Sequence, residues 1–131
     1  MLREGIKGEI RKVVTNDDTA VVYKSGEAEV YATPAMAALM EETAWMSIKP
    51  YLDEEESSVG TMLCITHISP TPIGMSVVCQ SHLVTMEGKK LVFELRVEDE
   101  KGLIGEGTHE RVIVEKEKFQ TKANKKAETI K

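Results

Sequence analysis

The stretch that decides the fold runs from Thr33 to Pro50 and reads TPAMAALMEETAWMSIKP. Apolar side chains recur at helical spacing between Ala35 and Lys49. Thr33 is a good N-cap, because its hydroxyl can accept a free backbone N–H, and Pro34 loses no hydrogen bond at the first helical position. Since proline cannot continue a helix, Pro50 ends the segment. The stretch predicts one long helix, the only strong one in the chain.

Strand-like segments lie on both sides of this helix. Before it, residues 8–14 and 20–23 look like short strands separated by a turn at 16–18. After it, strands are predicted at 61–68, 74–86, 91–97 and 103–115, with a tight hairpin turn at Glu87-Gly88. The order of strand, long helix and a meander of four antiparallel strands predicts an α+β domain whose sheet wraps a central helix.

Length and composition describe one domain, residues 1–131, with a net charge of −5. No apolar run approaches the roughly 20 residues that span a bilayer, and the first residues lack the apolar core of a secretory signal. Cys64 and Cys79 stand among apolar residues of predicted strands. We expect them to be free thiols in a reducing compartment, the cytoplasm.

Charge is distributed unevenly along the chain. Residues 115–131 carry a net charge of +3, so the preceding 114 residues carry −8. A nucleic-acid-binding domain normally has a basic face on its folded body, and this body is acidic. The sequence therefore disfavours nucleic acid as a partner, and residues 119–131 are expected to form a solvated basic tail.

Three polar residues stand out in these elements. Glu41 lies on or beside the apolar face of the predicted helix, where it either reaches water from the edge or has a paired role. His67 ends an apolar strand just before a proline-rich loop, as a structural residue or as a general base. Thr33 is explained by capping alone, although a helix N-terminus also favours a bound oxyanion.

Other familiar sites are missing from the sequence. The three histidines lie 15 and 27 residues apart and no CxxC pair occurs, so no metal site is predicted. Nucleotide-binding and nucleophile-elbow motifs are also absent, and we expect no cofactor. His109 lies in an unusually polar strand beginning, residues 105–111, and His82 shows no signal.

Three segments in order carry a family resemblance: residues 31–41, 60–67 and 105–111. They resemble hot-dog-fold thioesterases of the fluoroacetyl-CoA thioesterase type, and the similarity extends from about Tyr31 to Phe119. The family implies a long helix wrapped by an antiparallel sheet, normally as a homodimer. An unpaired edge strand on the predicted sheet favours the same assembly.

The resemblance implies that Thr33, Glu41 and His67 act together on an acyl-CoA thioester. His67 would be the general base, Glu41 would orient it or take part in attack, and Thr33 would bind the acyl group or serve as nucleophile. Gly60 would hold the thioester oxygen through a nearby backbone N–H. Arg111 would bind near the acyl or pantetheine end.

The expected substrate follows from where the chain departs from the family. The member specialised for fluoroacetyl-CoA has bulky aromatic residues upstream of its threonine, whereas residues 24–29 contain none, and Pro34 replaces a small residue. A short- or medium-chain acyl-CoA is therefore expected. Two alternatives stay open at this point: a non-catalytic module that binds acyl-CoA or another small ligand, and a hot-dog dehydratase.

Overall fold

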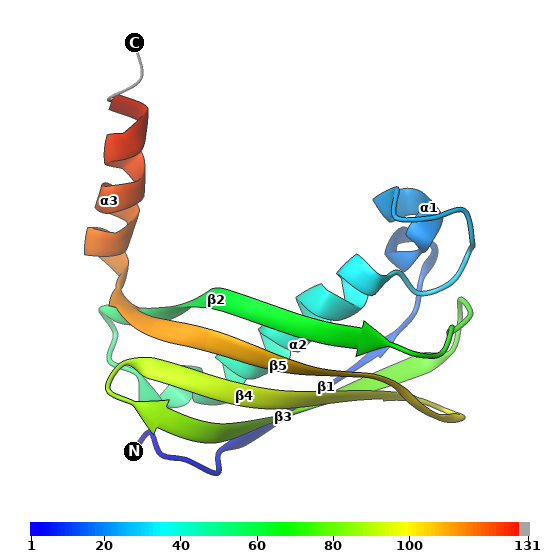
Figure 1. Ribbon diagram of the computed structural model, residues 1–131, viewed down its shortest axis with the longest axis horizontal. Helices are drawn as coiled ribbons and strands as arrows, with labels where there is room; N and C mark the ends of the chain where they lie inside the picture. Colours follow the sequence, from blue (N-terminus) through cyan, green and yellow to red (C-terminus); the bar gives the residue numbers. More distant parts are fainter. Residues whose placement is uncertain (129–131) are drawn as a thin grey trace.

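A five-stranded antiparallel sheet and one long helix form the body of the protein in the computed structural model, which describes residues 1–128 (Figure 1). The strands are β1 (Lys7–Val13), β2 (Glu56–His67), β3 (Ser76–Glu87), β4 (Lys90–Asp99) and β5 (Gly102–Glu115). The helices are α1 (Ala20–Tyr23), α2 (Thr33–Ile48) and α3 (Lys116–Glu128), with single 3-10 turns η1 (Asn16–Asp18) and η2 (Lys49–Tyr51). The predicted α+β order with one long helix is confirmed.

The strand order is β1-β3-β4-β5-β2, and all neighbouring strands are antiparallel. The predicted meander is therefore wrong for its first member, because β2 does not pair with β3. The chain leaves β2 through a loop that contains Pro70 and Pro72, and β3 starts on the far side of the sheet, where β1 covers its outer edge. Within residues 1–128, β2 is therefore an edge strand that pairs only with β5.

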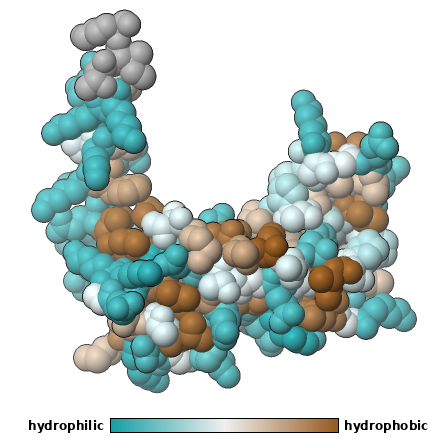
Figure 2. Space-filling model, in the orientation of Figure 1, coloured by the Kyte–Doolittle hydropathy of each residue, from teal (hydrophilic) through white to brown (hydrophobic). Residues whose placement is uncertain are grey.

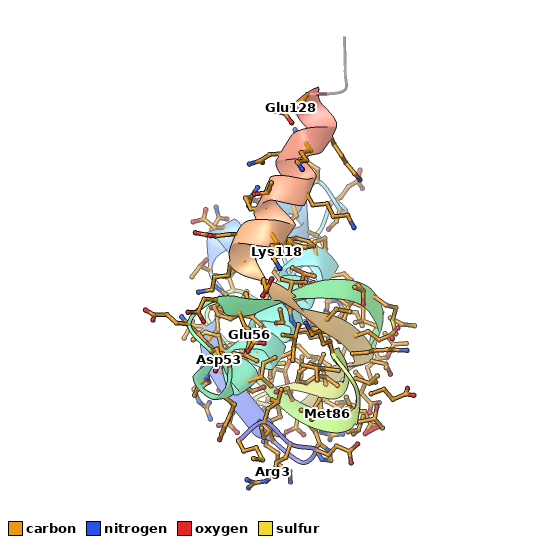
Figure 3. All side chains as sticks on the ribbon, turned by 90° about the vertical axis from the view of Figure 1, so that its left-hand side faces the viewer. Arg3, Asp53, Glu56, Met86, Lys118 and Glu128 are labelled. Atoms are coloured by element: carbon orange, nitrogen blue, oxygen red, sulfur yellow. The ribbon has the colours of Figure 1, made fainter. Side chains whose placement is uncertain are left out.

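The core lies between α2 and the face of the sheet that curves around it (Figure 3). Met36, Met40 and Ile48 are fully buried on the helix, and Phe93 is among the large side chains that meet them from the sheet. Burying each such side chain stabilises the fold by about 1.5–3 kcal/mol relative to exposure. The packing therefore fixes which face of α2 meets the sheet, and with it the positions of Thr33 and Glu41.

The segment Ala20–Tyr23 was expected to be a strand and is instead helix α1. Thr19 caps this helix by accepting a hydrogen bond from the Val22 backbone N–H. Lys24 ends it with a left-handed backbone, φ 58°. In the described chain, the segment does not join the free outer edge of β1; the Thr19 cap at one end and the left-handed Lys24 at the other stabilise it as a single helical turn.

Residues 116–128 form α3, a helix that the sequence did not predict, and its side chains are exposed. It projects from the end of β5 (Figure 1), and Figure 2 shows a hollow between α3 and the lobe that contains α1. The remaining residues of the expected basic tail, 129–131, lie outside the described part of the chain. None of the helices in residues 1–128 combines the length and apolar character needed to cross a membrane.

Candidate active site

Thr33 and His67 form the first polar group of the site. Thr33 is the first residue of α2, His67 is the last residue of β2, and the Thr33 Oγ1 lies 2.7 Å from the His67 Nδ1. The predicted capping role of Thr33 is wrong by one position, since Ala32 is the N-cap and no side chain caps the helix. The hydroxyl is therefore free to bond the imidazole.

The His67 ring is half-buried and incompletely hydrogen-bonded. Its edge packs against the ring of Tyr31 at a centroid distance of 6.4 Å and an interplanar angle of 79°. Its Nε2 is buried and has no hydrogen-bond partner within residues 1–128. Burial lowers the pKa of His67, with a backbone group of Ser69 opposing the shift. The imidazole is therefore neutral at pH 7 and able to accept a proton.

Glu41 and Gly60 belong to a second polar group, further along both elements. Glu41 is half-buried on α2, and its Oε2 would lie only 2.8 Å from a Cβ atom added to Gly60. The pairing of β2 with β5 shifts register between Gly60 and Met62, which marks a β-bulge. A side chain at residue 60 would displace the carboxylate, so glycine is required for this close approach.

Arg111 and His109 complete the second group from β5. Arg111 is 6% exposed and His109 is fully buried. The Arg111 Nε donates to the Ser58 Oγ (2.8 Å), the Nη2 donates to the Ser58 backbone carbonyl (2.9 Å), and the Nη1 lies 3.1 Å from the His109 Nε2. Burial lowers the pKa of Arg111, and the Glu41 carboxylate opposes that shift. Arg111 therefore stays inside the protein as a buried cation near Glu41.

The structure thus divides the five residues singled out from the sequence into two groups, Thr33 with His67 and Glu41 with Gly60 and Arg111. Seven residues of β2 separate His67 from Gly60, which is roughly 20 Å of strand. Eight residues of α2 separate Thr33 from Glu41, about 12 Å along the helix. Within residues 1–128, no hydrogen bond or ion pair joins Glu41 to His67.

Sequence reasoning missed two members of the second group, Ser58 and His109. Ser58 carried no signal, because serine at the start of a strand is ordinary. His109 did carry one: it lies two residues before Arg111, and side chains two apart in a strand share a face. Two polar side chains on the buried face of a strand need hydrogen-bond partners, and this need could have pointed to a buried network.

Other features of the described chain contribute less to a site. Residues 1–128 contain no cluster of side chains able to hold a metal ion. Cys79 is buried, which raises the pKa of its thiol to about 11 and keeps it protonated. A furrow of about 840 Å³ crosses the outer face of the sheet, but none of the five predicted site residues lines it.

Comparison with known proteins places the chain among thioesterases. A family model described as fluoroacetyl-CoA-specific thioesterase matches residues 14–117. The fluoroacetyl-CoA thioesterase of Streptantibioticus cattleyicolor is 40% identical over 98 residues, which are 75% of this chain and 70% of that protein. Both comparisons agree with the resemblance found in the sequence.

Solved structures agree with this relationship. A crystal structure of the fluoroacetyl-CoA thioesterase FlK is 34% identical and matches with a TM-score of 0.89, covering 96% of this chain and 98% of that one. A Thermus thermophilus protein of the thioesterase superfamily is 28% identical and matches with a TM-score of 0.90, covering 98% and 95%. The predicted hot-dog fold is confirmed. The chain belongs to the fluoroacetyl-CoA-specific thioesterase family, and it is an acyl-CoA thioester hydrolase.

Proposed function

We propose that this enzyme hydrolyses a short- or medium-chain acyl-CoA to the free acid and CoA, with Thr33, His67 and Glu41 as its catalytic residues. The observation that carries the proposal is the hydroxyl–imidazole pair of Thr33 and His67, 2.7 Å apart. A base adjoining a hydroxyl, with a further ring nitrogen that has no partner, can activate water or the hydroxyl itself.

In the proposed reaction either water or the Thr33 hydroxyl forms a bond to the thioester carbonyl carbon and gives its proton to His67. The negative charge that develops on the carbonyl oxygen is held by backbone N–H donors near Gly60. Collapse of this intermediate breaks the C–S bond, and the proton held by His67 passes to the departing sulfur. If Thr33 attacks, a water molecule then hydrolyses the acyl-enzyme in a second step and releases the acid. The lowered pKa of His67 supports the first step, because the ring is neutral at working pH.

Glu41 supports the cationic form of His67 in this scheme. A carboxylate beside an imidazolium stabilises it electrostatically, as in other acid–base sites. The buried position of Arg111, close to Glu41 and Gly60, supports a role near the acyl or pantetheine end of the substrate. Because the guanidinium of Arg111 already bonds to Ser58 and His109, we do not expect it to contact the phosphates of CoA.

A homodimer is part of the proposal. The edge of β2 is unpaired within the described chain, and an open edge of 12 residues offers a row of backbone groups with which a second copy can pair. The hollow in Figure 2 lies over this side of the sheet, and Met62 on β2 and Phe119 on α3 expose 36% and 43% of their surface. A second copy fits these observations.

The same assembly supports bringing the two polar groups together. The bulge between Gly60 and Met62 takes up one residue of β2, so Gly60 and His67 point to the same face of the sheet. In the register with β5 both lie three paired positions from Cys64. If two antiparallel β2 strands pair around a two-fold axis at Cys64, Gly60 of one chain lies opposite His67 of the other. Glu41, which adjoins Gly60, would then approach His67 across the interface.

An acyl-CoA panel assayed with a thiol reagent tests the function. We expect thiol release from one or more acyl-CoA substrates between acetyl-CoA and decanoyl-CoA. We expect no preference for fluoroacetyl-CoA, because residues 24–29 lack aromatic side chains. Absence of thiol release across the whole panel would contradict the proposal. Hydration of an enoyl-CoA, measured in parallel, would instead favour the dehydratase alternative.

Light scattering tests the assembly. We expect twice the mass of the 14.6 kDa chain at micromolar concentration, and a monomeric mass would contradict the dimer.

Both cysteines are unpaired within residues 1–128, which supports the proposal of a cytoplasmic, reducing compartment.

A further inference from the structure

His109 is a histidine that the proposed reaction does not use, although it is completely buried. It lies on the inner face of β5 opposite Leu63 of β2, and its ring lies 6.2 Å from the ring of Phe93. Burying a polar ring among apolar side chains is costly unless its nitrogens are hydrogen-bonded. Both nitrogens of His109 are bonded, which indicates a defined orientation.

The two partners of His109 fix its protonation state. The Nδ1 lies 2.8 Å from the Met62 backbone carbonyl, which only accepts, so the Nδ1 carries the proton. The Nε2 lies 3.1 Å from the Arg111 Nη1, which only donates, so the Nε2 is unprotonated. His109 is therefore neutral, and a second proton would place two cations against each other.

Charges from the surrounding elements agree with a neutral ring. Burial lowers the pKa of His109 most, and Arg111, on the same strand, lowers it further. The hydrogen bond to Met62 on β2 and the Glu41 carboxylate on α2 oppose the shift. The geometry of the bonds and the charges around the ring lead to the same state.

Together His109 and Arg111 bind β2 on both sides of Gly60. Arg111 holds Ser58, two residues before the glycine, and His109 holds Met62, two residues after it. A Cβ atom added to Gly60 would lie 3.1 Å from the His109 Cε1 and 3.5 Å from the Arg111 Nη1. The network thus spans the bulge against which the Glu41 carboxylate lies.

We propose that His109 is a positioning residue for thioester hydrolysis: as a neutral imidazole it holds Arg111 and the Gly60 bulge in place beside Glu41. The inference rests on the proposed function, because it gives Glu41 a part in the reaction. Within residues 1–128, His109 makes no hydrogen bond to Glu41 and none to Thr33 or His67. Its contribution passes through Arg111 and the β2 backbone.

Three substitutions separate the two bonds of His109. His109→Gln places an amide oxygen near the former Nε2, where it can accept from Arg111. His109→Asn places an amide N–H near the former Nδ1, where it can donate to Met62. His109→Leu removes both bonds. His82→Leu, on the outer face of the sheet, is the matched control for loss of an imidazole.

We expect His109→Leu to lose at least about tenfold in kcat, with KM within about threefold of wild type, since a misplacement of about 1 Å can cost up to a hundredfold. His109→Gln should recover most of kcat, His109→Asn should not, and His82→Leu should match wild type. Equal kcat values in the Gln and Asn variants would overturn the positioning role of His109. Losses of kcat that are merely proportional to each variant's decrease in Tm would overturn it as well.

A direct measurement of the ring completes the test. In ¹⁵N spectra of the wild-type imidazoles we expect a neutral Nδ1–H tautomer for His109 at pH 7, and a charged ring or an Nε2–H tautomer would overturn the inference. The wild-type assay distinguishes two failures. An inactive wild type contradicts the proposed function and this inference with it, whereas an active wild type with an equally active His109→Leu contradicts only the role of His109.

Discussion

The two polar groups of the site differ in how completely their hydrogen bonds are satisfied. In the Thr33–His67 group one ring nitrogen is bonded to a hydroxyl and the other is buried without a partner in the described chain. In the second group both nitrogens of His109 are bonded. An unsatisfied nitrogen is available to a substrate, whereas a satisfied one holds structure. Two histidines on the same face of one sheet can thus be assigned different tasks.

The largest expected effect comes from removing one ionisable group from each side of this comparison. His67→Ala and Glu41→Gln should each lower kcat/KM by at least about a hundredfold, because acid–base groups typically contribute that much. The thiol-release assay on the best substrate measures both. Glu42→Gln, on the exposed neighbour of Glu41, is the matched control and should stay active. Unchanged turnover in His67→Ala would show that His67 takes no part in the reaction.

Mixing the two inactive variants tests whether the groups act across an interface. If Glu41 of one chain serves His67 of another, a mixed dimer of His67→Ala and Glu41→Gln contains one intact site. Random exchange of subunits after mild unfolding should then restore about a quarter of wild-type activity. Each variant refolded alone is the control. Failure to restore activity in dimers shown to be mixed would place both groups in one chain.

Gly60→Ala is expected to act on the second group alone. The new Cβ would lie 2.8 Å from the Glu41 Oε2, the end of a flexible side chain, so the carboxylate moves rather than the backbone. We expect a loss of about tenfold or more in kcat and a change in Tm of only a few degrees. Gly26→Ala, whose Cβ would meet only the Ala20 Cβ at 3.6 Å, is the control.

Thr33→Val and Thr33→Ser probe the other group. Valine keeps the shape but leaves the His67 Nδ1 without its hydroxyl partner, whereas serine keeps that partner. We expect about a tenfold loss of kcat for valine and a loss within about threefold for serine, if the hydroxyl only orients the ring. A valine variant as inactive as His67→Ala would identify Thr33 as the nucleophile.

The fold was predictable from the sequence to the extent that local patterns determine it. The helix around Met36 and Met40 follows from apolar spacing that packing then satisfies. The position of β2 beside β5 was not predictable, because strand order depends on long-range pairing that no local signal encodes. The strand prediction for segment 20–23 was wrong for a local reason: its apolar residues favour a strand, whereas the Thr19 cap and the left-handed backbone of Lys24 stabilise a helical turn.

The residues of the candidate site were proposed from the sequence, and their division into two groups could not be predicted from it. Thr33, Glu41 and His67 came from residue types out of place and from family resemblance. Their separation along α2 and β2 depends on how the helix crosses the sheet. His109 was noted in an unusually polar strand beginning but given no role, and its 0% exposure shows that it is buried.

The smallest expected effect is on stability at acid pH, and His67 and His109 both contribute to it in the same direction. Burial lowers the pKa of both His67 and His109 in the folded chain, while the unfolded chain binds protons near pH 6.5. The unfolded state therefore binds more protons below about pH 6.5. The stabilising contribution of the neutral rings is present above that pH and is lost as the pH falls toward the folded pKa.

Chemical denaturation of wild type and His109→Gln between pH 8 and pH 5 measures this effect. Because the glutamine does not titrate, the variant should lose less free energy of unfolding on acidification than wild type, and the two curves should approach each other at low pH. Parallel curves would mean that His109 binds its proton equally in both states. That result would contradict a ring held neutral between Arg111 and Met62, and with it the contrast between the two histidines.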